Sequence, residues 1–135
     1  MYKLIISSLL SLTFLLSPHA AAKNCEDAKT SIQMNRCAAI KLEVAHHQMT
    51  KYFDATYKLY ATNPTELESI KVDQQDWETY IASHCDSIYA IWEESRKKAF
   101  VSIFCMTNKT DERTAEIWKT YLSNTNKPVL PKPHK

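Results

Sequence analysis

The 135-residue sequence predicts an all-α fold: an antiparallel helical hairpin plus a third helix, cross-linked by two disulfides. Apolar residues recur at intervals of three and four along most of the chain, which is the spacing of one helical face. Thr30 and Asn63 each stand three residues before a Gln or Glu, the pattern of a capping box at a helix start. The chain contains no glycine, which disfavours tight hairpins and most all-β folds because these need residues at positive φ.

The N-terminal segment has the composition of a secretory signal peptide. Lys3 precedes an apolar and hydroxyl-bearing run over residues 4–16, and small residues follow at positions 20–22. About 13 such positions are too few for a membrane span, which needs roughly 20. We therefore predict a signal peptide over residues 1–22, cleavage after Ala22, and a periplasmic or secreted protein that is not attached to the membrane after cleavage.

The first predicted helix starts at the Thr30 capping box and ends near Thr62. Asn63 is the expected N-cap of the second helix, with Pro64 at its first position and Glu66 closing another capping box. The second helix extends to about Glu94, and its short connection makes it antiparallel to the first. The core positions expected from the two helices are Ala38, Leu42, Ala45, Met49, Tyr52, Phe53, Thr56 and Tyr60, then Leu67, Ile70, Gln74, Trp77, Ile81, Cys85 (or His84), Ile88 and Trp92.

A third helical stretch is predicted from a turn near Ser95, a possible N-cap, to about Leu122. Its polar section over residues 108–113 indicates either a kink or a solvated section before Ile117 and Trp118 resume the apolar pattern. This places the helical domain over residues 23–123. The tail over residues 124–135 contains three prolines and three lysines and is expected to be disordered or in a polyproline II conformation.

The four cysteines, Cys25, Cys37, Cys85 and Cys105, predict two disulfides, because the chain is small and the expected compartment is oxidising. Three connectivities are possible. A turn near Ser95 brings Cys85 and Cys105 to similar heights, but pairing of Cys37 with either of them is also geometrically open. We favour Cys25 with Cys37 and Cys85 with Cys105.

Charge and motifs argue against several classes of function. Seventeen basic and 15 acidic residues are too balanced to indicate nucleic-acid binding. No G-x-S-x-G, H-E-x-x-H or other catalytic motif is present, so we predict a protein that is not an enzyme. The cysteines lack the C-x-x-C spacing of a zinc site, and His46, His47 and His84 are expected at the surface, so neither a metal nor a cofactor is predicted.

The order of the cysteines and of several polar and aromatic residues resembles the lysozyme inhibitor LprI-like domain of bacterial exported proteins. The resemblance covers nearly the whole chain after the signal peptide and is carried by Cys25, Gln33-Met34-Asn35, Cys37-Ala38, Leu67, Gln74, Trp77, Tyr80, Cys85, Cys105, Thr110 and Arg113. The chain departs from the family pattern at His46, Met49, Thr50 and Ile81. The resemblance implies a small helical exported domain and, in part of the family, inhibition of lysozyme.

A binding surface is expected around the Asn63-Pro64 turn. Tyr57 and Tyr60 are candidate aromatic anchors there, and Glu66 and Glu68 are candidate charges that would attract a basic enzyme. The expected partner is a protein, either lysozyme or another peptidoglycan hydrolase. The alternatives are an immunity protein against a rival's toxin hydrolase and a structural or envelope-stress protein without an enzyme target.

Overall fold

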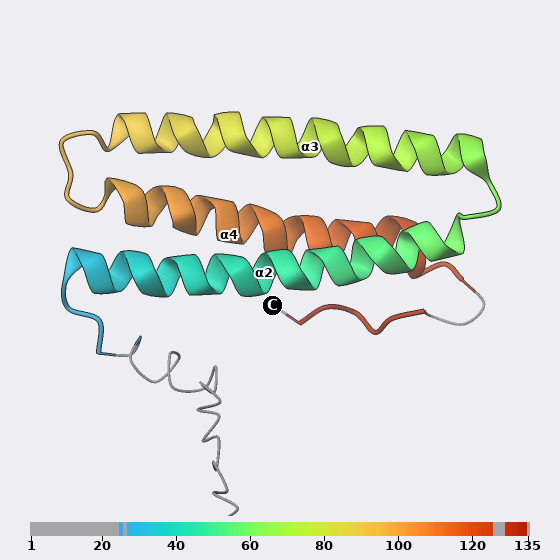
Figure 1. Ribbon diagram of the computed structural model, residues 1–135, viewed down its shortest axis with the longest axis horizontal. Coiled ribbons are helices and arrows are strands. Elements are labelled where there is room, and N and C mark those ends of the chain that lie inside the picture. Colours follow the sequence, from blue (N-terminus) through green and yellow to red (C-terminus); the bar gives the residue numbers. More distant parts are fainter. Residues whose placement is uncertain (1–24, 26, 126–128, 135) are drawn as a thin grey trace, which may run out of the picture.

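The computed structural model describes residues 25, 27–125 and 129–134, and its helices form a long antiparallel bundle (Figure 1). The α-helices are α2 (Ser31–Leu59), α3 (Pro64–Ile91) and α4 (Lys98–Ile117), and the π-helical turn η1 (Trp118–Leu122) continues α4. The all-α prediction is confirmed. The boundaries differ from the predicted ones by about three residues at the ends of the first and second helices.

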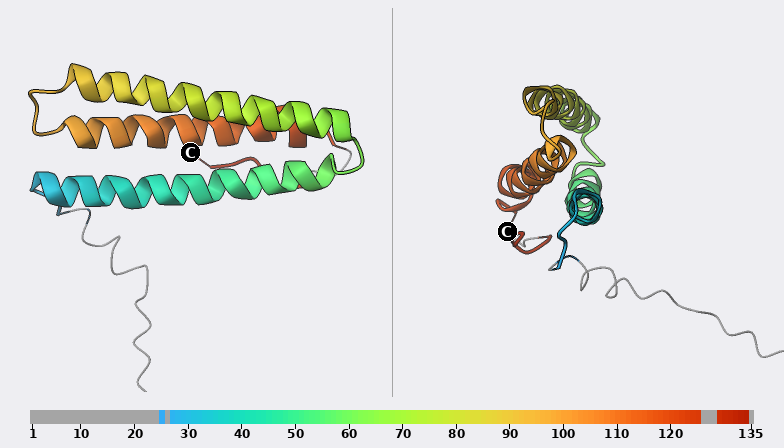
Figure 2. Two further views of the ribbon diagram at one scale, coloured as in Figure 1. Left: turned by 45° about the horizontal axis from the view of Figure 1, so that its top comes forward. Right: turned by 90° about the vertical axis from the view of Figure 1, so that its left-hand side faces the viewer.

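Helix α4 is the central helix of the bundle. It runs antiparallel to α3 and parallel to α2, and it makes the main contacts with both (Figures 1 and 2). Beyond the turn that joins them, α2 and α3 diverge and α4 lies between them (Figures 1 and 2). Helix α3 is therefore an edge helix, and only a narrow stripe of it is buried, formed by Ile70, Gln74, Ile81 and Cys85. The side chains of α2 and α3 still meet in the core, where Gln74 Nε2 lies 3.9 Å from Met49 Sδ.

The hydrophobic core gathers where α2, α3 and η1 converge. Its buried residues are Met49, Tyr52, Phe53, Ile70, Ile117 and Leu122, and the half-buried rings of Trp77 and Trp118 pack against them. On α2 the predicted face is buried almost as expected, at Ala38, Ala45, Met49, Tyr52, Phe53 and Thr56. Trp92 was expected in the core, but it follows the last residue of α3 and is 44% exposed. That expectation is wrong because α3 ends at Ile91, so Trp92 does not continue the buried face of the helix.

The two helix starts predicted as capping boxes differ in the structure. At Thr30 the Gln33 amide donates to Thr30 Oγ1 at 3.2 Å, and the Thr30 amide donates to Gln33 Oε1 at 3.1 Å. Asn63 is the N-cap of α3 and Pro64 follows at the first position, but the Asn63 side chain makes no capping hydrogen bond. Its Nδ2 instead donates to Glu66 Oε2 at 2.9 Å, so the prediction of a second capping box is wrong.

The turn from α3 to α4 begins at Trp92 and ends with Lys97 as N-cap. Ser95, the expected N-cap, lies two residues earlier and accepts a hydrogen bond from the Lys97 amide at 3.1 Å. No described residue has a positive φ, so the described turns are built without the left-handed conformation that glycine favours.

Helix α4 is continuous through the polar section over residues 108–113, without the kink considered above. The section is not solvated throughout either, because Thr110, Arg113 and Thr114 are buried. The hydroxyls of Thr110 and Thr114 donate to backbone carbonyls one turn earlier, at 2.8 and 2.9 Å, which satisfies their polar atoms inside the bundle.

Two disulfides join the cysteines in the favoured pairing, Cys25 with Cys37 and Cys85 with Cys105. The first ties the lead-in segment to α2, and the second ties α3 to α4 near the α3–α4 turn. Ser102 supports the second link by donating to the Cys85 carbonyl at 3.2 Å. No described cysteine is free.

The C-terminal residues 129–134 are not helical, as expected, but they lie against the bundle where disorder was also considered. Leu130 packs on the hydrophobic core. The backbone carbonyls of Leu130 and Pro131 accept hydrogen bonds from Trp118 Nε1 at 3.0 Å and from the Tyr52 hydroxyl at 2.7 Å. The predicted signal peptide at 1–22 lies outside the described residues.

Replacement of Thr30 should destabilise the domain more than replacement of Asn63. Thr30→Ala removes a working capping box, so we expect the free energy of unfolding to fall by about 0.5–2 kcal/mol. Asn63→Ala removes only an exposed side-chain contact with Glu66, so a loss of at most about 0.5 kcal/mol is expected. Urea denaturation of the two variants measures the difference, and an equal or larger loss for Asn63→Ala would contradict the assignment.

Candidate protein-binding surface

The two tyrosines predicted as anchors beside the Asn63-Pro64 turn are half-buried. Tyr57 packs edge-to-face on Phe53 with ring centroids 4.7 Å apart, and Tyr60 packs edge-to-face on Tyr121 at 6.2 Å. Burial raises the pKa of the Tyr57 hydroxyl, and nearby carboxylates, including Glu68, raise it further. Both rings thus contribute to the packing near the turn, and each remains only partly accessible to a partner.

The two carboxylates predicted at the turn are exposed. Glu66 is held by Asn63, as described above, and Glu68 pairs with Lys71 at 3.7 Å. The Glu68 side chain remains 70% exposed in this pair. An exposed pair of this kind contributes little to stability, so the Glu68 carboxylate can interact with another protein at small cost.

Helix α3 carries most of the acidic character of the bundle. It contains six carboxylates and one lysine, a net charge of −5, in a chain whose net charge is +2. Helix α2, on the other edge of the bundle, contains four basic and two acidic residues. The bundle is therefore electrically asymmetric from edge to edge, with the negative edge on α3.

A shallow hollow lies on the outer surface of α3 and concentrates part of this charge. Its lining contains three carboxylates and one hydrophobic residue, Val72, which is exposed. The lining residues are Thr65, Glu68, Ser69, Val72, Asp73 and Asp76. An exposed apolar side chain among like charges suits contact with a basic protein surface, because charge attracts the partner and burial of the apolar side chain stabilises the contact.

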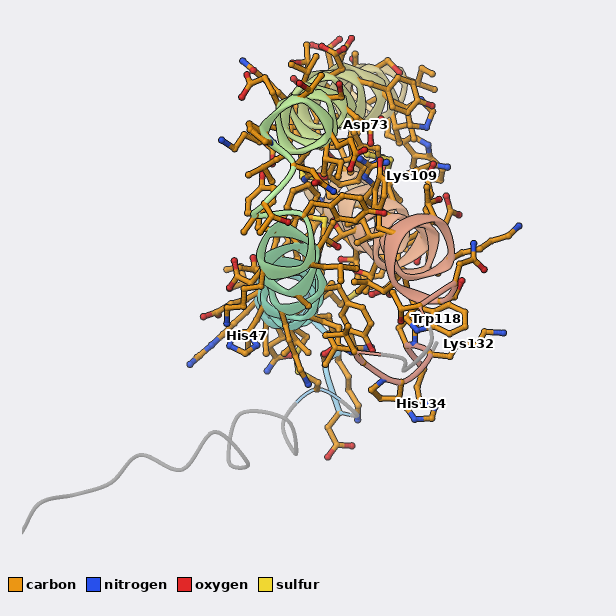
Figure 3. The ribbon with its side chains drawn as sticks, turned by 90° about the vertical axis from the view of Figure 1, so that its right-hand side faces the viewer. His47, Asp73, Lys109, Trp118, Lys132 and His134 are labelled. Carbon is orange, nitrogen blue, oxygen red and sulfur yellow. A yellow bond between two sulfur atoms is a disulfide. The ribbon has the colours of Figure 1, made fainter. Side chains whose placement is uncertain are left out.

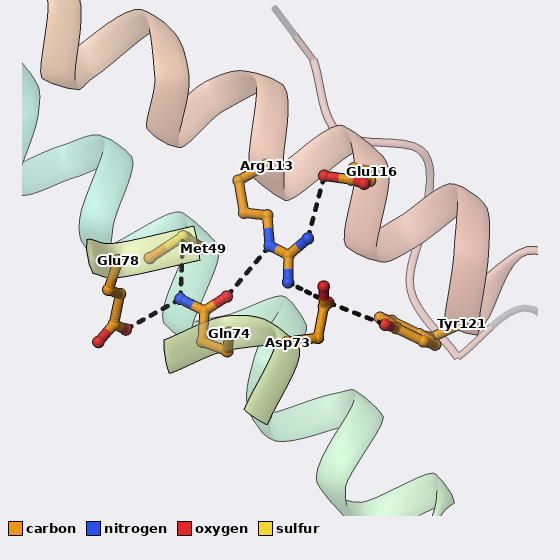
Figure 4. Close-up of polar contacts among 7 residues, drawn as sticks. All are labelled: Met49, Asp73, Gln74, Glu78, Arg113, Glu116 and Tyr121. Atoms are coloured by element: carbon orange, nitrogen blue, oxygen red, sulfur yellow. Dashed lines mark hydrogen bonds and ion pairs between the residues drawn. The ribbon is translucent and has the colours of Figure 1, made fainter. Parts of the chain in front are cut away.

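A buried arginine fixes the position of this surface relative to the bundle (Figure 4). The Arg113 side chain, from α4, is 3% exposed and bonds to three residues. Its Nε donates to Gln74 Oε1 at 3.1 Å, its Nη1 donates to Glu116 at 3.0 Å, and its Nη2 pairs with Asp73. Burial acts to lower the pKa of Arg113, but the hydrogen bonds to Asp73 and Glu116 outweigh burial and raise it.

The network extends from Arg113 to both sides of the α3–α4 interface. The Tyr121 hydroxyl donates to Asp73 Oδ2 at 3.1 Å, and Gln74 Nε2 donates to Glu78 Oε1 at 3.0 Å. The guanidinium also lies over the ring of Trp77, 5.8 Å from its centroid. Asp73 belongs both to this network and to the hollow, so the network anchors the acidic surface to the bundle.

Several residues that carried the family resemblance lie in this interface. Arg113 contacts both Gln74 and Trp77, and Thr110 is buried one turn before Arg113. Their role in the structure is to hold α3 on α4. Tyr80 differs, because it is exposed and stacks on His84 with ring centroids 5.5 Å apart.

Asp73, Tyr121 and Glu116 were not expected from the sequence as partners of Arg113. The sequence did contain one signal. Arg113 has the helical spacing of the apolar positions of its stretch, and a buried arginine requires polar or charged partners.

The described residues offer no metal centre and no helix that could cross a membrane. No group of three or more His, Cys, Asp or Glu among them could hold a metal ion. His46 and His47 are exposed on α2 and His84 is half-buried. None of the described helices combines the length and the apolar character that a membrane span requires.

A protein-family model described as "Lysozyme inhibitor LprI" matches residues 21–117 of the chain. The match includes the four cysteines and the whole Arg113 network except Tyr121. No curated protein and no solved structure matches the chain.

Arg113→Ala should destabilise the domain far more than Lys109→Ala on the same helix. Removing Arg113 leaves the buried Gln74 carbonyl oxygen without its donor and uncovers Trp77, so we expect a loss of about 1–3 kcal/mol. Lys109 forms a more exposed ion pair with Glu112 at 2.8 Å, and its loss should cost less than about 1 kcal/mol. Chemical denaturation of both variants tests this difference, and similar losses would show that the Arg113 network does not hold α3.

Proposed function

Because the chain belongs to the lysozyme inhibitor LprI family, we propose that it is an exported, non-enzymatic protein that binds and inhibits lysozyme or another peptidoglycan hydrolase. The proposed contact surface is the acidic outer face of α3. The observation that carries this choice is the net charge of −5 on an edge helix whose outer face is exposed.

The contact surface proposed on α3 begins at the turn expected from the sequence and extends further along the helix. Glu66 and Glu68 remain part of it, and the hollow adds Val72, Asp73 and Asp76. Tyr57 and Tyr60, which are half-buried, contribute at its margin. The charges of this surface would speed association with a basic hydrolase, while Val72 and the two tyrosines would slow dissociation.

The rigidity of this surface supports the same proposal. The Cys85–Cys105 disulfide and the Arg113 network hold α3 at two separate points, so a partner would not need to order the helix on binding. A preformed surface loses less entropy on association than a flexible one.

Charge reversal on α3 should weaken inhibition by slowing association. We expect Glu68→Lys with Asp76→Lys to lower the association rate constant for c-type lysozyme by about tenfold at low salt and to flatten its salt dependence. The control is Glu43→Lys with Asp54→Lys, which makes the same change in net charge at exposed positions of α2. Surface plasmon resonance at several salt concentrations, together with a cell-wall lysis assay, measures both effects.

Equal effects of the two double variants would contradict the proposal that the partner binds α3. They would show that only the net charge of the protein affects association. If the unmodified protein at micromolar concentration inhibits no lysozyme of the c, g or i type, the lysozyme target is wrong. The alternative target is then a hydrolase delivered by a rival strain. In that case, deletion of the gene should make cells more sensitive to this hydrolase.

A further inference from the structure

The C-terminal residues 129–134 lie along α2 and α4, on the side of this helix pair that faces away from α3 (Figures 1 and 2). The hollow between the two helices, lined in part by Val44, Thr107 and His134, is called the α2–α4 groove. The segment runs along the groove from the η1 end toward the middle of the bundle. Viewed along the bundle in Figure 3, Trp118 and His134 lie on the opposite side of the molecule from Asp73. The groove is thus separate from the acidic face of α3.

The groove holds this segment as binding proteins hold extended peptides. Tyr52 and Trp118 donate to two consecutive backbone carbonyls, and the Leu130 side chain packs on the hydrophobic core. Pro131 and Pro133 favour the extended polyproline II conformation, which loses little entropy on binding. Aromatic donors to carbonyls and an apolar surface for a side chain together recognise an extended segment containing leucine and proline.

The groove does not end where the described segment ends. Beyond His134 it continues between α2 and α4 as an open channel of about 470 Å³ that reaches the Cys25–Cys37 disulfide. A further pocket of about 250 Å³, lined in part by Phe100 and Phe104, adjoins it at the same disulfide. Val44 is 65% exposed and Phe104 is 54% exposed along this part, so apolar surface there is uncovered in the described part of the chain.

We propose that the α2–α4 groove is a binding site for an extended leucine- and proline-containing segment of a protein partner, and that the C-terminal segment is its occupant in cis. A partner segment would place leucine and proline where Leu130 and Pro131 lie and apolar residues against Val44 and Phe104. Helix α2, α4 and Tyr52 lie within the family match, whereas Trp118 and the occupant lie beyond residue 117.

The cis occupant makes this site selective for length. A tethered segment has an effective concentration in the millimolar range, so a short peptide that only reproduces its contacts competes poorly. A longer segment gains the open channel next to His134, which the described residues 129–134 do not fill. The groove is therefore closed to short segments and accessible to those that extend past His134.

Two fluorescent probes test this proposal on the full mature chain. The first has the sequence of residues 128–135, and the second carries additional C-terminal leucines that would reach the open channel. Leu130→Asp expels the occupant, so we expect it to bind the first probe at least about tenfold more tightly than the unmodified protein does. Val129→Asp is the matched control, because it adds the same charge at an exposed neighbouring residue and should bind as weakly as the unmodified protein.

The second probe gives a readout that does not depend on the folding of Leu130→Asp. Added to the unmodified protein, it should shift the NMR resonance of the Trp118 indole N–H saturably, and Val44→Asp with Phe104→Asp should weaken this response at least about tenfold. The absence of any shift at millimolar probe would overturn the proposal, as would failure of a folded Leu130→Asp variant to bind either probe.

A measurement of the oligomeric state shows whether the segment in the groove comes from a partner protein or from a second copy of this chain. Light scattering should show a monomer at micromolar concentration. A dimer that the first probe dissociates would assign the groove to the C-terminal segment of another copy and overturn the assignment to a partner. Lysozyme inhibition is expected to be unchanged in Leu130→Asp, so failure here and failure of the proposed inhibitor function are distinguishable.

Discussion

The buried guanidinium of Arg113 is the interaction on which the arrangement of α3 depends. Helix α3 buries only a narrow stripe, so specific links to α4 add to the limited apolar packing that holds it. The Cys85–Cys105 disulfide ties it at one end of the bundle, and Arg113 ties it near the other through Asp73 and Gln74. Because Asp73 and Glu116 are only partly buried, solvent stabilises their charges, and Arg113 is compensated without a fully desolvated ion pair.

This arrangement leaves the bundle with two different free surfaces. One is the outer face of α3, which is acidic because most of its residues are not needed for packing. The other is the groove of the α2–α4 pair, of which residues 129–134 cover one part. Central α4 contributes to both, since it carries Arg113 toward α3 and Thr107 toward the groove. A family description that ends at residue 117 includes the first surface and lacks the occupant of the second.

Local signals in the sequence predicted the elements that depend on neighbouring residues. The Thr30 capping box and the buried face of α2 follow from spacings within one helix. The spacing of the cysteines left three connectivities open, and the favoured pairing is the one observed. The side chain of Asn63 could not be predicted in this way, because its amide could either cap the backbone or contact Glu66, three residues away in both cases. Trp92 was misplaced because the apolar period continues for one position beyond the helix.

The remaining differences arise from contacts between residues far apart in the sequence. Arg113 meets Asp73 across 40 positions, and Tyr52 meets Pro131 across 79. A polar section of α4 and a proline-containing tail both look solvated until such partners are known. The candidate site was predicted in part for the same reason: the carboxylates at the turn were visible in the sequence, whereas the hollow around Val72 requires the orientation of α3.

The central claim is that α3, held by Arg113, presents the surface that binds a peptidoglycan hydrolase. An NMR titration of the isotopically labelled mature protein with unlabelled c-type lysozyme tests it most directly. Residues 65–76 on the outer side of α3 should show the largest chemical-shift changes, with the α2–α4 groove unaffected. Changes confined to that groove or to α2, or none at saturating lysozyme, would contradict the claim.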